Sequence, residues 1–78
     1  MASGASVEHD VLNFELASRL DHAVRQLSEP VRAAFALRGI HGLSTTEVAT
    51  VLEVSESAVK MRLARAREAL RVQLKEYL

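Results

Sequence analysis

The 78-residue sequence contains no cysteine, and aromatic residues, glycine and proline are scarce. Without cysteine, disulfide frameworks and thiolate metal sites are excluded. The only aromatic residues are Phe14, Phe35 and Tyr77, whereas alanine, leucine and valine are abundant, and this composition favours helices over strands. No run approaches the roughly 18 apolar residues of a membrane-spanning helix, and the polar N-terminus has no signal-peptide core. We therefore expect a cytoplasmic protein with no membrane segment.

The charge of the chain is distributed unevenly, although its formal net charge is zero. Residues 1–54 contain four basic and seven acidic residues, a net charge of −3. Residues 55–78 contain six basic and three acidic residues, a net charge of +3. A basic C-terminal segment on an acidic body indicates a polyanionic partner at one face of the protein.

Apolar residues recur at helical spacing from about Asp10 to Leu27 and predict a first helix there. They are Leu12, Leu16, Leu20, Ala23, Val24 and Leu27. Residues 1–8 are mostly small and polar and predict a flexible tail, so the folded domain is expected to span residues 9–78.

Ser28 can cap a second helix, and Pro30 suits its first turn because an N–H group needs no partner there. This helix is expected to run to about Arg38 and to end at Gly39.

Two further helices follow, each with its own capping residue. Ser44 and Glu47 have the spacing of a capping box, which starts a short third helix. A turn at Glu53-Val54 follows, and Ser55 caps a long fourth helix that is expected to continue to Leu78.

The fourth helix has two different faces. Its apolar residues fall within an arc of about 80° at 100° per residue. They are Val59, Leu63, Ala66, Leu70 and Leu74. The basic residues lie on the two sides of the opposite face, so the helix suits a major groove between two phosphate walls.

A short helix, a turn of about three residues and a capped second helix with a basic exposed face are typical of a helix-turn-helix. Ala49 is small where the two helices must cross, and Val59 and Leu63 can anchor the second helix on the core. The predicted fold is therefore all-α: a small four-helix domain with a C-terminal helix-turn-helix.

Residues 27–70 resemble region 4, the C-terminal domain of bacterial sigma factors, and in particular that of the extracytoplasmic-function group. The most specific motifs are Gly42-Leu43-Ser44 before Glu47-Val48-Ala49, and Val59-Lys60-Met61-Arg62-Leu63 before Arg65-Ala66-Arg67 and Leu70. The resemblance implies recognition of the promoter −35 element by a domain docked on the flap of the RNA polymerase β subunit. It also implies that an anti-sigma factor can sequester the domain.

The resemblance also implies which residues contact double-stranded DNA. The base readers would lie on the fourth helix: Lys60, Met61, Arg62 and Arg65, with Ser57 and Ala58 near its start. Thr45 and Thr46, at the start of the third helix, would meet phosphates through hydroxyl or backbone N–H groups.

The sequence departs from the family pattern at three single positions. Glu53 stands where glycine is usual and φ is often positive, at a cost of about 1 kcal/mol. Ser28 stands where the family often has proline. Met61 replaces a residue that is commonly small and polar; it can touch a thymine methyl group but cannot form a bidentate base contact.

The preceding sigma domain, which binds the −10 element, has no room in 78 residues. Together with the small residues at positions 1–4, this favours an excised C-terminal domain, which would bind DNA and polymerase but would not initiate transcription alone.

Two alternatives to the sigma-factor interpretation remain. A LuxR-type response-regulator domain has a similar frame around Glu47 and Lys60, but it usually has a histidine two residues after that lysine and dimerises through its last helix. A protein-interaction module would use the basic helix to bind an acidic partner, such as an anti-sigma factor.

No arrangement of residues indicates catalysis, a cofactor or a metal site. The three histidines, His9, His22 and His41, have no metal-ligand spacing, and neither a Ser-His-Asp set nor a glycine-rich phosphate loop is present. We expect a monomeric DNA-binding domain that is not an enzyme.

Overall fold

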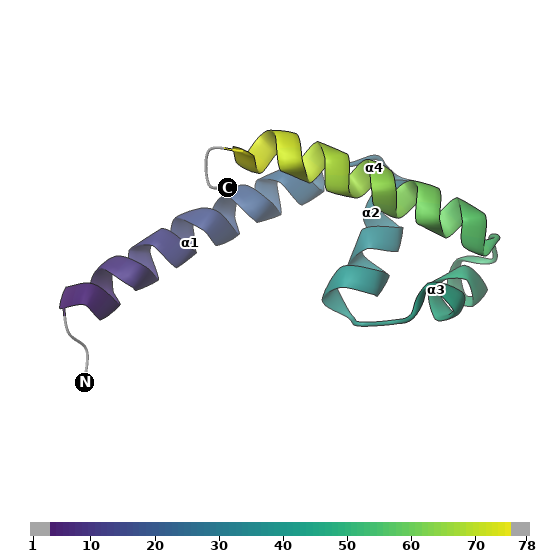
Figure 1. The fold of residues 1–78 in the computed structure, drawn as a ribbon, viewed down its shortest axis with the longest axis horizontal. Coiled ribbons are helices and arrows are strands. Elements are labelled where there is room, and N and C mark those ends of the chain that lie inside the picture. The colour runs from purple at the N-terminus through teal and green to yellow at the C-terminus, as the bar shows by residue number, and fades with distance from the viewer. Residues whose placement is uncertain (1–3, 76–78) are drawn as a thin grey trace.

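The computed structural model describes the backbone of residues 4–75 and the side chains of residues 10–75. The described elements are α1 (Gly4–Arg25), α2 (Glu29–Phe35), η1 (Ala36–Ile40), α3 (Thr45–Leu52) and α4 (Glu56–Leu74). Residues 4–75 contain no strand, which confirms the all-α prediction and its four helices. In Figure 1, α1 and α4 run side by side over part of their length, and α2 and α3 lie beneath α4.

The molecule is elongated, with principal extents of 48 × 26 × 17 Å, because α1 projects beyond the other helices (Figure 1). This helix begins at Gly4, earlier than the predicted start near Asp10, and ends at Arg25 rather than Leu27. The apolar periodicity that located the helix does not extend back to its first residues, so the pattern could not indicate the true start. The flexibility of residues 1–8 stays a prediction, and residues 1–3 lie outside the described part of the chain.

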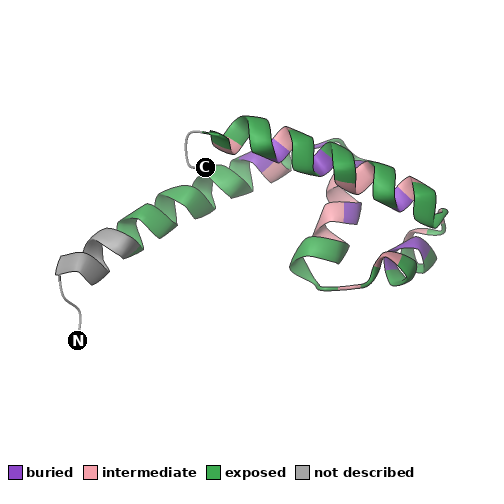
Figure 2. Cartoon of the chain, in the orientation of Figure 1, coloured by how far each residue is buried: buried purple, intermediate pink, exposed green. Residues whose placement is uncertain are grey.

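The apolar stripe of α1 is only partly buried. Ala23 and Leu27, at and just beyond its C-terminal end, are buried, and Val24 is half-buried. Leu12, Leu16 and Leu20 are exposed by 59%, 38% and 38%. Figure 2 shows the same change along the described part of the helix, from exposed residues in its middle to buried ones at its junction with the body.

The core consists of two clusters of small and aliphatic side chains, and α4 contributes to both. The first contains Ala34, Val48, Ala49 and Val59, and the second contains Leu27, Val31 and Ala66. Val48 and Val59 are fully buried, and burial of a valine contributes roughly 1.5–3 kcal/mol. Because Val59 and Ala66 lie two turns apart on one face, α4 joins the helix-turn-helix to the junction of α1 and α2.

The end of the second helix differs from the prediction. Gly39 does not end it: the chain continues through the π-helical turn η1, where the His41 N–H donates to the Ala36 carbonyl at 2.9 Å. Gly42, with φ of 76°, is the residue that turns the chain away. Gly39 instead lies against the Phe35 ring, where a Cβ would be 3.4 Å from a ring carbon.

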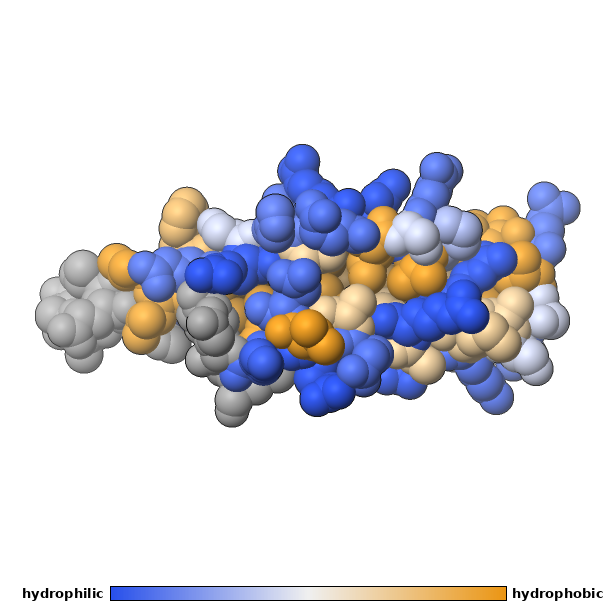
Figure 3. Space-filling view, turned by 90° about the horizontal axis from the view of Figure 1, so that it is seen from above, coloured by the Kyte–Doolittle hydropathy of each residue, from blue (hydrophilic) through white to orange (hydrophobic). Residues whose placement is uncertain are grey.

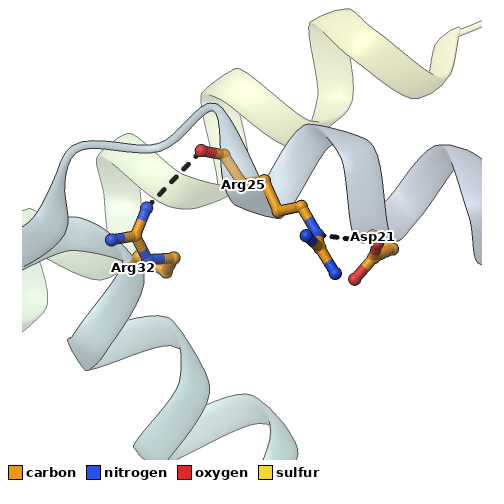
Figure 4. A network of polar contacts seen from close by, with 3 residues as sticks. All are labelled: Asp21, Arg25 and Arg32. Atoms are coloured by element: carbon orange, nitrogen blue, oxygen red, sulfur yellow. Dashed lines mark hydrogen bonds and ion pairs between the residues drawn. The ribbon is translucent and has the colours of Figure 1, made fainter.

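At the α1–α2 corner the side chain of Arg32, rather than the predicted serine cap, makes the hydrogen bonds that join the two helices (Figure 4). The Arg32 guanidinium donates to the carbonyls of Arg25 at 3.4 Å and Leu27 at 3.1 Å, and Arg25 pairs with Asp21 at 2.9 Å. Ser28 occupies the N-cap position with extended backbone, but its hydroxyl makes no capping hydrogen bond. Pro30 at the start of α2 removes one of the N–H groups that such a hydroxyl can accept from.

Candidate nucleic-acid interface

The helix-turn-helix consists of α3, the turn at Glu53-Val54 and α4. Val54 donates its N–H to the Ala49 carbonyl at 3.0 Å, which closes the turn. Glu53 has φ of 57° and ψ of 45°, so the predicted positive φ at this position is confirmed. A left-handed residue at the end of α3 lets the chain reverse quickly into α4.

Both helices of this unit begin at the predicted serines. In the capping box of α3, the Glu47 N–H donates to the Ser44 hydroxyl at 3.1 Å and the Ser44 N–H donates to the Glu47 carboxylate at 2.8 Å. At α4, the Ala58 N–H donates to the Ser55 hydroxyl at 3.0 Å. These contacts fix the start of each helix, and therefore the direction in which its first turn points.

The two faces predicted for α4 are confirmed. Val59, Ala66 and Leu70 are buried, and Leu63 and Leu74 are half-buried. The described helix ends at Leu74; the last three residues of its predicted range lie outside the described part of the chain.

The predicted DNA contacts occupy different depths on α4. Ser57, Lys60, Met61 and Arg65 are exposed, whereas Ala58 and Arg62 are half-buried. Arg62 therefore lies lower on the side of the helix than Arg65 does. Figure 3, which looks onto the α4 side of the molecule, shows hydrophilic side chains interspersed with apolar ones rather than a continuous hydrophilic surface.

Most cations of the interface have no partner within the described residues. Arg25 pairs with Asp21, and Arg71 pairs with Glu68 at 2.6 Å. No hydrogen bond or ion pair in this part of the chain engages the side chains of Arg38, Lys60, Arg62, Arg65 or Arg67. The cations near the first turns of α4 are thus not engaged in ion pairs among these residues, whereas Arg71 is held by Glu68.

A groove of about 520 Å³ lies between α4, the end of α2 with η1, and the first residue of α3. It is lined by Phe35, Arg38, Gly39, Thr45, Lys60, Leu63 and Arg67. Three cations and no acidic residue line this groove, so it can receive an anion. Thr45 is half-buried in its wall; Thr46 is exposed, does not line the groove, and accepts the Thr50 hydroxyl at its carbonyl at 3.1 Å.

Arg38 and Arg67 are candidate contacts beyond the individual DNA-contact residues predicted from the sequence. Arg67 belongs to the predicted basic flank of the fourth helix, on the same side as Lys60. Arg38 carries no such signal, since it belongs to η1 and reaches the groove only through the packing of α2 on α4.

Neither a membrane-spanning helix nor a metal-binding cluster occurs among the described residues. Within residues 4–75, no helix has the length and apolar character needed to cross a bilayer. The same residues hold no group of three His, Cys, Asp or Glu side chains placed to share a metal ion.

The family model and the individual relatives that match this chain agree on one family. Residues 17–70 match the family described as Sigma-70, region 4. The RNA polymerase sigma-H factor of Pseudomonas aeruginosa is 37% identical over 65 residues, 83% of this chain and 34% of that protein. The ECF RNA polymerase sigma factor SigW of Bacillus subtilis is 33% identical over 76 residues, 97% of this chain and 41% of that protein.

The ECF RNA polymerase sigma-E factor of Escherichia coli K12 is 35% identical over 63 residues, 81% of this chain and 33% of that protein. The chain therefore spans between a third and about two fifths of the length of these relatives.

Proposed function

This chain belongs to the sigma-70 region 4 family, and we propose that it recognises the promoter −35 element as the DNA-binding domain of a sigma factor. The observation that carries the proposal is the set of cations around the first turns of α4 that have no partner among residues 10–75. Phosphates supply the missing partners, and the release of their counterions favours binding. The proposed role is recognition rather than catalysis, in the cytoplasm where the chromosome lies.

In this proposal α4 enters the major groove with its buried face turned away from the DNA. Arg62 and Arg65 face one wall of the groove, and Lys60 and Arg67 face the other. Arg38 adds a cation to the second side from outside the helix-turn-helix, because it shares the groove with Lys60. The capping box uses the N–H groups of Ser44 and Glu47, so those of Thr45 and Thr46 are left to face a phosphate.

Protein partners belong to the same proposal: the flap of the RNA polymerase β subunit, with an anti-sigma factor as its competitor. Support comes from α1, which projects beyond the body of the domain. Its apolar stripe is exposed there at Leu12, Leu16 and Leu20. A row of exposed leucines on a projecting helix is a surface that a protein partner can cover. The free domain is proposed to be a monomer.

The DNA part of the proposal is tested by selecting sequences from a randomised duplex pool at near-physiological salt, followed by an NMR titration. We expect a short preferred motif and chemical-shift changes concentrated at residues 57–65. If about five phosphates are neutralised, log K should fall with log salt at a slope of about −4.5. The affinity of this chain alone is expected to be modest, because one small module buries limited surface and lacks linkage to a second DNA-binding domain.

Two results would contradict this part of the proposal. One is the absence of any preferred duplex, even at low salt. The other is a set of shifts confined to α1 and α2, which would make the helix-turn-helix a scaffold for protein docking.

The protein part is tested with Leu12→Ser and Leu16→Ser in a binding assay with core RNA polymerase. We expect weaker polymerase binding and unchanged DNA binding. Val11→Ser is the matched control, because Val11 is similarly exposed at 52% but falls outside the stripe. Equal losses in all three variants would show that the stripe is not the docking surface.

A further inference from the structure

Met61 is a large apolar side chain on the outer face of α4. It is exposed by 55%, whereas the apolar residues on either side of it in the sequence, Val59 and Leu63, turn inward. At 100° per residue, Met61 lies almost opposite the centre of the buried stripe. Met61 is therefore an apolar group in the middle of a charged face, where it can contact a molecule outside the domain.

The residues in line with Met61 along the helix offer few hydrogen bonds. Ser57, Met61 and Ala64 follow one another at i, i+4 and i+7, and all three are exposed. Ser57, in the first turn, carries a polar side chain, and Glu68 continues the same line two turns beyond Met61. Between these two polar residues the line is apolar and narrow, with Arg65 about 40° to one side of Met61.

The major groove presents one apolar feature to a side chain, the 5-methyl group of thymine. Hydrogen-bond donors and acceptors mark the other base edges, and neither Met61 nor Ala64 can satisfy them. The methionine side chain is unbranched and polarizable, so it can adjust to a methyl group whose position varies with DNA geometry.

We propose that Met61, with Ala64 on the following turn, reads thymine methyl groups, so that the bound site has thymine opposite the centre of α4. Met61 and Ala64 are about 4.5 Å apart along the helix axis, close to the 3.4 Å step between bases of one strand. The two side chains can thus meet neighbouring base steps. This inference rests on the proposed DNA-binding function and specifies what it recognises.

The test uses the preferred duplex obtained by selection with the 78-residue chain. Each thymine is replaced singly by deoxyuridine, which removes the methyl group and leaves every hydrogen-bonding group in place. We expect about fourfold weaker binding at one or two positions, the effect of losing one buried methyl-sized group. In Met61→Ala the replacement at the position that Met61 contacts should have no further effect, because the two partners of one contact are not additive, whereas a position that Ala64 contacts should stay sensitive.

Two variants sharpen the result. Val72→Ala is the matched control, since Val72 is exposed by 54% on the same side of α4 but eleven residues further along; it should keep the full sensitivity to deoxyuridine. Met61→Gln should change the preferred base at the affected position from thymine to adenine, which a glutamine side chain can bind in bidentate fashion.

The outcomes separate this inference from the function on which it rests. A preferred motif that is insensitive to deoxyuridine at every position, or equally sensitive in Met61→Ala, would overturn the methyl-reading role and leave DNA recognition intact. Selection that yields no preferred motif would overturn both. The methyl-reading role would be established if deoxyuridine weakened binding at the same one or two positions in the wild-type chain and in Val72→Ala, but not at the Met61 position in Met61→Ala.

Discussion

The side chains of Ser44 and Glu47 each accept a hydrogen bond from the other residue's backbone N–H, at 3.1 and 2.8 Å. This reciprocal contact sets the first residue of α3 and holds Thr45 at the edge of the basic groove. Ser28 occupies the equivalent position before α2 without any side-chain hydrogen bond. The two serines thus provide a comparison within one chain between a working cap and an unused one.

Ser44→Ala is expected to lower the free energy of unfolding by about 1 kcal/mol, because an N–H group at the start of α3 loses its acceptor. Ser28→Ala should change it by less than about 0.5 kcal/mol, since no capping bond is lost. Urea denaturation followed by circular dichroism measures both. Equal losses would mean that the capping box does not stabilise this domain.

Glu47 makes the stability of the domain depend on pH in the acid range. The Ser44 backbone N–H, and secondly the Ser44 hydroxyl, lower the pKa of the Glu47 carboxyl in the folded state. A lowered folded pKa gives stability that is present above the unfolded value of about 4.3 and is lost as the pH falls through the folded pKa. In Glu47→Gln, the free energy of unfolding should start lower and fall less steeply below about pH 5.

The measurement for Glu47 is a series of urea titrations at several pH values. Glu29→Gln removes a carboxylate that is not part of the capping box and serves as the control. A wild-type pH dependence that persists unchanged in Glu47→Gln would show that the capping carboxylate is not its source.

Glu53→Gly is expected to stabilise the domain by about 0.5–1 kcal/mol, because Glu53 has φ of 57° and glycine adopts this left-handed conformation without a steric cost. Glu53→Ala keeps the Cβ and should bring no such gain. Chemical denaturation of the two variants distinguishes relief of backbone strain from loss of the glutamate charge. A gain of the same size in Glu53→Ala would point to the charge.

Arg65→Ala is expected to weaken binding to the selected duplex by about 1–3 kcal/mol and to relax the preference at one base position. Arg65 is exposed and has no partner among residues 10–75, so its whole charge is available to DNA. Arg71 is held by Glu68 at 2.6 Å, and Arg71→Ala should cost less. Fluorescence anisotropy with single-base variants of the duplex measures both effects, and a uniform loss across all sequences would assign Arg65 to the phosphate backbone.

Arg38→Ala and Arg67→Ala should each reduce the salt slope of DNA binding by about one, if each neutralises one phosphate from the groove they share with Lys60. The order of preference among duplex sequences should stay the same, because phosphate contacts carry no base information. Arg25→Ala is the control, since Arg25 pairs with Asp21 at the end of α1. An unchanged slope in both groove variants would remove the groove from the DNA contact surface.

Local sequence rules predicted much of this molecule, and their limits are visible at particular residues. The Ser44 capping box and the Ser55 cap follow from chemistry within a few neighbouring residues, and both are present. The left-handed Glu53, also present, was implied by the resemblance to sigma-factor region 4. Local rules were wrong at Gly39 and at the Ser28 hydroxyl. There the outcome depends on the Phe35 ring packed against Gly39 and on Pro30 in the first turn of α2.

The candidate site was predicted only in part, for a similar reason. Helical periodicity gives the angle of each residue on α4, so it separated the buried stripe from the exposed face. It gives no measure of how deeply a residue near the edge of the stripe is covered, and Arg62 is half-buried. The DNA contacts themselves stay predictions.

The helices, most of their caps and the two-sided character of α4 could be predicted from the sequence, because these features depend on interactions within one or two helical turns. Tertiary structure alone decided that Arg38 joins Lys60 and Arg67 in one groove, and that the apolar stripe of α1 is covered at Ala23 but bare at Leu12. Such relationships join residues that are far apart in the chain or depend on where one helix leaves another. They are set by the packing of α1 and α2 on α4, which no local pattern contains.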